Sequence, residues 1–274
     1  TAIVSATTDT DAGDTGTSSN QPTEQKAVTV TKDESSAQFD SLEDALAAAE
    51  EGSTITLNEN ITVTQSAYIT KGITLNGNGH SITGVGDFSS SSNPAVVLID
   101  TDNAVVLSNL SIIGGTSNKF PLNIYTSPNV SLNNVSVTNV FTNGGAMLVN
   151  ASSVTVNGNL SVSTAAGSWY GINVDSGVGV ETTNPILTFA EGSKMTYTNT
   201  DDGSYNAEGP AAICVDKPIQ YTNAIAGYEA AGLAAPTRNE KQQDLYYLAQ
   251  AADVEVSGSM ICEHGNALLI KEVH

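Results

Sequence analysis

The sequence predicts an all-β fold in which short parallel strands stack as a solenoid. Two observations carry this prediction. Apolar and polar residues alternate with a period of two along most of the chain beyond residue 51, and a set of short strand-like segments recurs every 25 residues. Three short strands per repeat cannot share one hydrophobic face as hairpins. They can form one coil that stacks in parallel on the equivalent strands of the next coil.

The beginning of the chain differs from this pattern. Residues 1–26 form a Thr-, Ser-, Asp- and Gly-rich tract without hydrophobic periodicity, which predicts a polar tail or linker, and residues 27–274 are expected to form one domain. Between residues 39 and 51, apolar residues follow a helical spacing, with Asp40 or Ser41 as the N-cap and Gly52 as the stop. We therefore expect a short N-terminal capping helix ahead of the first coils.

The repeat is clearest in the first strand of each coil. Segments 122–125, 147–150 and 172–175 align at intervals of 25 residues, and segments 97–100, 213–216 and 268–271 fit the same pattern. Because side chains alternate along a strand, one aliphatic set should point inward. This set is Val97, Ile99, Leu122, Ile124, Met147, Val149, Ile172, Val174, Ile213 and Val215.

Two further strands follow in each repeat. The second is expected at 105–107, 130–132, 154–156 and 178–180. The third is expected at 110–112, 135–137 and 160–162, with a degenerate copy at 185–187. Each coil therefore contains three short strands in about 25 residues, and the length of the chain predicts about eight coils.

An asparagine precedes the third strand at intervals of 25 residues: Asn109, Asn134, Asn159 and Asn184. Asparagine tolerates the left-handed backbone of a sharp turn, and stacked amides can hydrogen-bond along the axis as a ladder. With this ladder the chain resembles the right-handed parallel β-helix, or pectin-lyase-like, superfamily, and its N-terminal helix and first coils look like those of bacterial surface proteins and adhesins. The resemblance covers residues 38–274 and implies a right-handed parallel β-helix. It does not select one function, since the superfamily includes lyases, hydrolases, adhesins and phage spikes.

Two insertions interrupt the predicted coils. Residues 190–210 are polar, and residues 217–251 include a helical segment at 238–249. Long loops on a rigid scaffold often carry binding sites. The chain ends at His274 just after a strand, so we expect either that the natural chain continues or that another subunit covers the last coil.

The charge excludes one class of partner. The chain has 9 Lys and Arg against 29 Asp and Glu, a formal net charge of −20. Nucleic acid needs clustered basic residues and is therefore excluded, and no segment approaches the roughly 20 apolar residues that membrane insertion requires. Cys214 and Cys262 have no metal-ligand spacing; two unpaired thiols are favoured, and one disulfide stays open.

Two aspartates are the candidate catalytic pair. Asp175 and Asp216 end equivalent strands, so their backbones would be about 4.8 Å apart if the coils are adjacent. Such a pair could act as the acid and base of a glycosidase or hold Ca²⁺, the one candidate cofactor. The alternative, which we favour, is that both are solvated surface residues.

A candidate ligand-binding surface lies on the outward face of the first strands. It comprises Tyr125, Asn150, Asn173, Trp169 and Tyr170. The aromatic rings could stack on sugars, or they could pack the turns that enter the strands, which we favour.

The resemblance also bears on catalysis. Pectate lyases of the superfamily use an exposed arginine beside calcium-binding aspartates, whereas Arg238, the single arginine here, lies in the second insertion. The sequence therefore favours a non-catalytic, secreted or cell-surface module with an adhesive or structural role, including head-to-tail self-assembly. Its expected partners are further copies of itself or a cell-surface glycan or protein. A polysaccharide lyase, a glycoside hydrolase or a glycan binder is the alternative.

Overall fold

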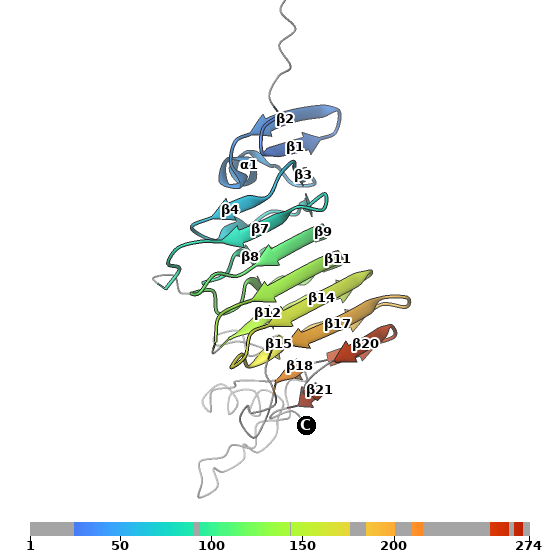
Figure 1. Cartoon of the computed structure of the whole chain (residues 1–274). Helices are drawn as coiled ribbons and strands as arrows, with labels where there is room; N and C mark the ends of the chain where they lie inside the picture. Colours follow the sequence, from blue (N-terminus) through green and yellow to red (C-terminus); the bar gives the residue numbers. More distant parts are fainter. Residues whose placement is uncertain are drawn as a thin grey trace, which may run out of the picture.

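The structure is a computed structural model that describes residues 25–89, 94–142, 144–175, 185–200, 210–215, 253–262 and 266–270. These residues form a mostly β structure with one helix, and nearly all strand pairs are parallel. Figure 1 shows the strands stacked in sequence order from the N-terminal to the C-terminal end. Within the described ranges no helix is both long and apolar enough to cross a membrane.

The larger sheet has 14 strands in the described part of the chain, and β19, β16, β13, β11, β9, β6, β3, β1 and β2 are neighbours in this order. A second row, joined to the first through β9 and β11, pairs β4 with β7, β7 with β9, β11 with β14, β14 with β17, and β17 with β20. The strands are β1 (Val28–Lys32), β2 (Ser35–Phe39), β3 (Thr54–Leu57), β4 (Ile61–Val63), β6 (Thr74–Asn76), β7 (Ser81–Gly84), β9 (Val105–Ile113), β11 (Val130–Asn139), β13 (Ser153–Val156), β14 (Asn159–Thr164), β16 (Ile186–Phe189), β17 (Lys194–Asn199), β19 (Asp253–Val256) and β20 (Ser259–Cys262).

The smaller sheet is parallel throughout and has seven strands among the described residues, in the order β21, β18, β15, β12, β10, β8 and β5. The strands are β5 (Ala67–Ile69), β8 (Val97–Ile99), β10 (Leu122–Tyr125), β12 (Gly145–Asn150), β15 (Tyr170–Asp175), β18 (Ala211–Val215) and β21 (Asn266–Ile270). The chain alternates between the two sheets, so each repeat contributes strands to both.

The predicted alignment of the first strands is confirmed. Leu122 pairs with Val97 on one side and with Met147 on the other. The same column continues through Ile172, Ile213 and Leu268. Every residue of the predicted inward set is buried, and together they form the centre of the hydrophobic core.

A bend at asparagine joins the second and third predicted strands. In β9, the buried residues are Val105 and Leu107 before Asn109, and Leu110 and Ile112 after it. The alternation slips by one residue at Asn109, whose φ is 47°, and the apolar side chains therefore stay on the core side as the strand turns. Asn134 repeats this bend in β11 with φ 55°.

The third and later strands differ from the prediction. Leu187 pairs with Val154, so segment 185–187 takes the second-strand position, and its assignment as a third strand was wrong. The third-strand position is taken by β17, inside the predicted insertion at 190–210, so that insertion was wrong over Lys194–Asn199. Met195 and Tyr197 alternate with polar residues and are fully buried, which explains why this segment forms a strand. The segments at 178–180 and 217–251, with the predicted helix at 238–249, lie outside the described residues.

The predicted N-terminal helix is present as α1 (Leu42–Ala48). Ser41 is its N-cap, and the Ser41 hydroxyl accepts a hydrogen bond of 3.1 Å from the backbone N–H of Asp44. Leu42 and Ala45 are buried against the core. Sequence reasoning missed the antiparallel β1–β2 hairpin, although the alternating segment 28–32 and Asp33, with φ 52°, are a signal for a strand and a turn.

The bend at Asn134 gives the first testable prediction. Asn134 donates a hydrogen bond to the side-chain oxygen of Asn109 (3.4 Å) and accepts one from the backbone N–H of Asn159 (3.2 Å). Asn134→Gly keeps the positive φ and loses these bonds, whereas Asn134→Ala also adds backbone strain. We expect the free energy of unfolding to fall by about 1 kcal/mol for Gly and about 2 kcal/mol for Ala. Urea denaturation measures both, and equal losses would contradict the role of φ at this bend.

Candidate functional site

The predicted ligand-binding residues lie along the smaller sheet. Tyr125 pairs with Asn150, and Asn150 with Asp175, on successive strands. Asn173 and Asp175 are buried, and the Asn173 amide donates a hydrogen bond of 2.9 Å to the Asp175 carboxylate. Asp175 is therefore held by an amide neighbour rather than being a fully solvated surface residue.

The predicted Asp175–Asp216 pair cannot be assembled from the described residues, because Asp216 lies outside them. The described part of β18 ends at Val215, which pairs with Val174. Across the described ranges, no group of three or more His, Cys, Asp or Glu side chains is close enough together to hold a metal ion. The catalytic and calcium assignments of this pair stay predictions.

Three side-chain amide oxygens on this sheet are buried without a hydrogen-bond donor among the described residues. They belong to Asn123, Asn150 and Asn173. A buried acceptor without a donor costs free energy, so a hydrogen-bond donor that reached these shielded oxygens would stabilise them.

The aromatic residues lie where the first strands begin. Tyr170 is buried and packs in a small cluster with Ala211 and Cys214, against which Trp169 lies half-buried. The ammonium group of Lys119 lies 4.5 Å from the centroid of the Trp169 ring, a cation–π contact. Tyr170 thus packs the sheet, while Trp169 keeps an exposed part beside a cation. No disulfide joins Cys214 to Cys262.

Hydrogen bonds connect three of the four asparagines of the predicted ladder. Asn109 and Asn134 are linked side chain to side chain, and Asn134 reaches the backbone of Asn159. The residue beside Asn159 in the next strand is Lys194, and Asn184 lies outside the described residues.

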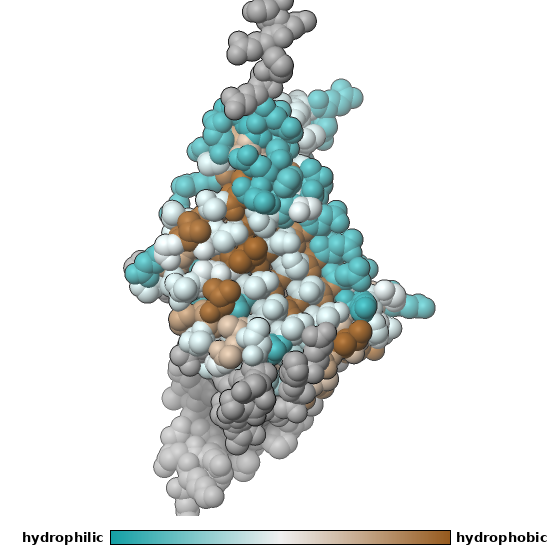
Figure 2. All heavy atoms as spheres, in the orientation of Figure 1, coloured by the Kyte–Doolittle hydropathy of each residue, from teal (hydrophilic) through white to brown (hydrophobic). Residues whose placement is uncertain are grey.

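Hydroxyl side chains dominate the face formed by β7, β9, β11, β14 and β17. Ser111 and Ser136 occupy equivalent positions, and their hydroxyl oxygens are 2.8 Å apart. Figure 2 shows this side largely in pale, near-neutral colours interrupted by several brown, hydrophobic patches, with strongly hydrophilic residues concentrated toward the N-terminal end and one edge. The residues that form this column are Ser81, Ser111, Ser136, Ser161 and Thr196.

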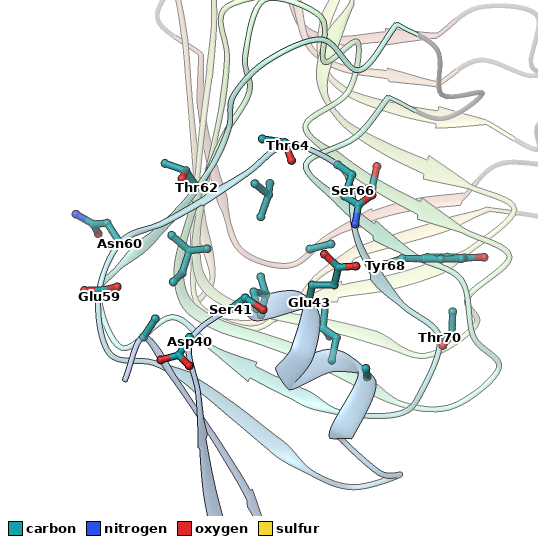
Figure 3. A pocket seen from close by; sticks show the side chains of 18 of the residues that line it. Asp40, Ser41, Glu43, Glu59, Asn60, Thr62, Thr64, Ser66, Tyr68 and Thr70 are labelled. Carbon is teal, nitrogen blue, oxygen red and sulfur yellow. The ribbon is translucent and has the colours of Figure 1, made fainter. Parts of the chain in front are cut away.

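A pocket of about 560 Å³ lies at the N-terminal end, between α1 and the strands β4 and β5. Figure 3 shows Glu43 reaching from α1 toward the pocket, with Thr62, Thr64 and Ser66 around it and the Tyr68 side chain directed away from it. Its apolar lining includes Leu42, Leu46, Val63 and Ala67. Sequence reasoning missed this pocket.

Acidic groups dominate the charge of the pocket. Asp40, Glu43, Glu59 and Lys71 are its charged lining residues. The Lys71 ammonium donates to the carbonyls of Ala49 (2.5 Å) and Ala47 (3.2 Å) at the end of α1. Asp40 pairs with Lys26 at 2.7 Å, while Glu43 and Glu59 have no ion-pair partner within the described residues.

Tyr68 connects the pocket to the neighbouring strand. It is 48% exposed, and its hydroxyl donates a hydrogen bond of 2.9 Å to Asp100 Oδ2. That hydrogen bond is the main cause that raises the pKa of Tyr68; partial burial and the negative charge of Asp100 add to it. The hydroxyl of Thr126 donates to the other oxygen of Asp100 at 2.7 Å.

The raised pKa of Tyr68 predicts a pH dependence. We expect Tyr68 to ionise above its ordinary pKa of 10.0, and Asp100→Asn to bring the pKa back toward that value. Because the folded-state pKa is raised, the stabilisation is complete below pH 10 and is lost as the pH rises through the folded pKa. Difference ultraviolet titration of the protein against Tyr68→Phe isolates this tyrosine. An unchanged titration in Asp100→Asn would contradict the assignment.

Comparison with protein-family models, with curated proteins and with solved structures found no match.

Proposed function

We propose that the chain is a right-handed parallel β-helix and that it serves as a non-catalytic module of a secreted or cell-surface protein. The 25-residue interval between paired residues of β10, β12 and β15 supports the β-helix, because it is the length of one coil. The strongest support for the functional part is the hydroxyl-lined face. Ser111 and Ser136 of this face hydrogen-bond to each other along the stack, and its repeated hydroxyl side chains present an almost uncharged surface on a chain of net charge −20.

Such a surface suits adhesion or a structural role rather than acid–base chemistry. Hydroxyl groups donate and accept hydrogen bonds but do not ionise at neutral pH. A stack with a continuous aliphatic core is also a rigid spacer that can hold a binding surface away from a cell. Head-to-tail assembly of copies is one form of the structural role.

A glycan array run beside sedimentation of the full chain tests this proposal. Selective binding to a glycan class without turnover, or concentration-dependent filaments, would support it. A strictly monomeric chain that binds no glycan would contradict it.

Glycan recognition or cleavage at the outer face of the smaller sheet is the second candidate. The buried acceptor oxygens of Asn123, Asn150 and Asn173 favour it, because sugar hydroxyls are hydrogen-bond donors. A panel of neutral and pectic polysaccharides distinguishes binding from cleavage. Product release that Asp216→Asn abolishes would support a lyase or hydrolase, whereas binding without product would leave a glycan-binding role.

A further inference from the structure

We propose that the N-terminal pocket binds an extended peptide with a basic side chain, which adds to the smaller sheet as a strand beside β5. This inference goes beyond the proposed function and does not depend on it. It would give the protein a peptide partner at the end of the stack, separate from the hydroxyl-lined face.

The first argument is the outer edge of β5, which α1 approaches but with which no further strand is paired among the described residues. Ala67 donates its backbone N–H to Val96 (2.8 Å), and Ile69 accepts from Asp100 (3.0 Å), so these two residues direct their backbone groups toward the adjacent strand. In a parallel sheet, the residue between them directs its N–H and C=O to the opposite side. That residue is Tyr68, and β5 is the last strand of its sheet within the described residues. Its backbone groups therefore offer a template for another strand.

The second argument is the space beside this edge. The pocket lies along β5, and its volume of about 560 Å³ is within the range of ligand-binding pockets, roughly 300–1,000 Å³. Leu42 and Leu46 of α1, with Val63 and Ala67, form its apolar lining. Alternate side chains of an added strand would point to this lining, while the others would face solvent.

The third argument is charge, which selects the occupant. Glu43 projects toward the pocket from α1 (Figure 3), and neither it nor Glu59 has an ion-pair partner in the described part of the chain. A Lys or Arg of the bound peptide would supply the missing cation. Residues 1–25 of the chain itself contain no Lys or Arg and lack this complementarity.

A displayed library of random octapeptides, selected on the full chain, tests the inference. We expect the enriched peptides to share one Lys or Arg, with β-branched or aromatic residues two positions away on either side. Synthetic copies of an enriched peptide then give the dissociation constant by fluorescence anisotropy.

Two matched variants distinguish this site from general acidity. Glu43→Lys should raise the dissociation constant of the basic peptide at least about tenfold, because one charged contact is lost. It should also increase the affinity for a copy of the peptide in which the basic residue is replaced by Glu. Glu34→Lys makes the same charge change at an exposed residue outside the pocket lining, and should leave the affinity unchanged within about twofold.

Backbone methylation tests strand addition itself. Alternate residues of the bound peptide direct their N–H groups toward β5 and away from it. N-methylation of the first set of residues should abolish binding, and N-methylation of the second set should have little effect. Binding that is insensitive to both registers, or to Glu43→Lys, would overturn the proposal, as would the absence of any enriched peptide. Self-association of the chain that Glu43→Lys abolishes would assign the pocket to a second copy and would also overturn it.

Discussion

Replacing Ile124 with alanine is expected to lower the free energy of unfolding by about 2–5 kcal/mol. Ile124 has no exposed surface and lies in the middle of the core column, between Ile99 and Val149 of the adjacent strands. Both neighbours belong to paired strands, so the structure cannot collapse into the cavity without disturbing two strand pairs. The loss should therefore include a cavity contribution besides the lost hydrophobic burial.

Urea denaturation of the full chain measures this loss, with Thr138→Ala as the matched control. Thr138 lies half-buried on the outward side of β11, and its replacement should cost no more than about 0.5 kcal/mol. Because contacts in a repeat structure are mostly between neighbours, amide hydrogen exchange should rise first in β8, β10 and β12. Equal losses for the two variants would contradict the inward orientation of Ile124.

The core column is the part of the fold that the sequence predicts best. Side chains alternate with a period of exactly two, so a shift of one residue would expose the whole aliphatic set of a strand. Leu122, Met147 and Ile172 can therefore be aligned from the sequence, and the structure pairs them as expected. The side-chain alternation, rather than strand propensity, determines the register.

The prediction failed where the repeat length changes. Leu187 follows its partner Val154 by 33 residues rather than 25, because the chain between β15 and β16 is longer than in earlier repeats. Counting in steps of 25 residues assigned segment 185–187 to the third strand of its coil, whereas it forms the second. The same count assigned Lys194–Asn199 to a loop. The alternation of Met195 and Tyr197 with polar residues was the signal in the sequence that could have corrected the count.

The pocket could not be derived from the sequence for a different reason. The helix itself was predictable from Ser41, Leu42 and Ala45, but the space beside it depends on how α1 packs against β5. That packing joins segments whose relative position no local pattern encodes. The exposure of Tyr68 on the end strand β5 marks this site, and it is visible only in the structure.

Gly144→Ala is the second substitution with a large expected effect, because it forces two backbones apart. A Cβ at Gly144 would lie 2.1 Å from the carbonyl oxygen of Lys119 and 2.9 Å from its carbonyl carbon. These atoms belong to the preceding repeat and cannot swing away as a flexible side chain could. The Lys119 carbonyl also accepts a hydrogen bond of 3.0 Å from Gly145, and the Gly144 carbonyl accepts one of 2.7 Å from Trp169.

We therefore expect Gly144→Ala to cost about 3 kcal/mol, at the upper end of the usual range for overpacking. Gly192→Ala is the control, because Gly192 has φ +79° with no atom within 4 Å of the added Cβ, and should cost about 1 kcal/mol from backbone strain alone. The chain contains a single tryptophan, so the fluorescence of Trp169 reports directly on the affected hydrogen bond and on the contact with Lys119. A shifted emission spectrum in Gly144→Ala, but not in Gly192→Ala, is the expected result. A smaller loss of stability in Gly144→Ala than in Gly192→Ala would contradict the close approach of the two repeats.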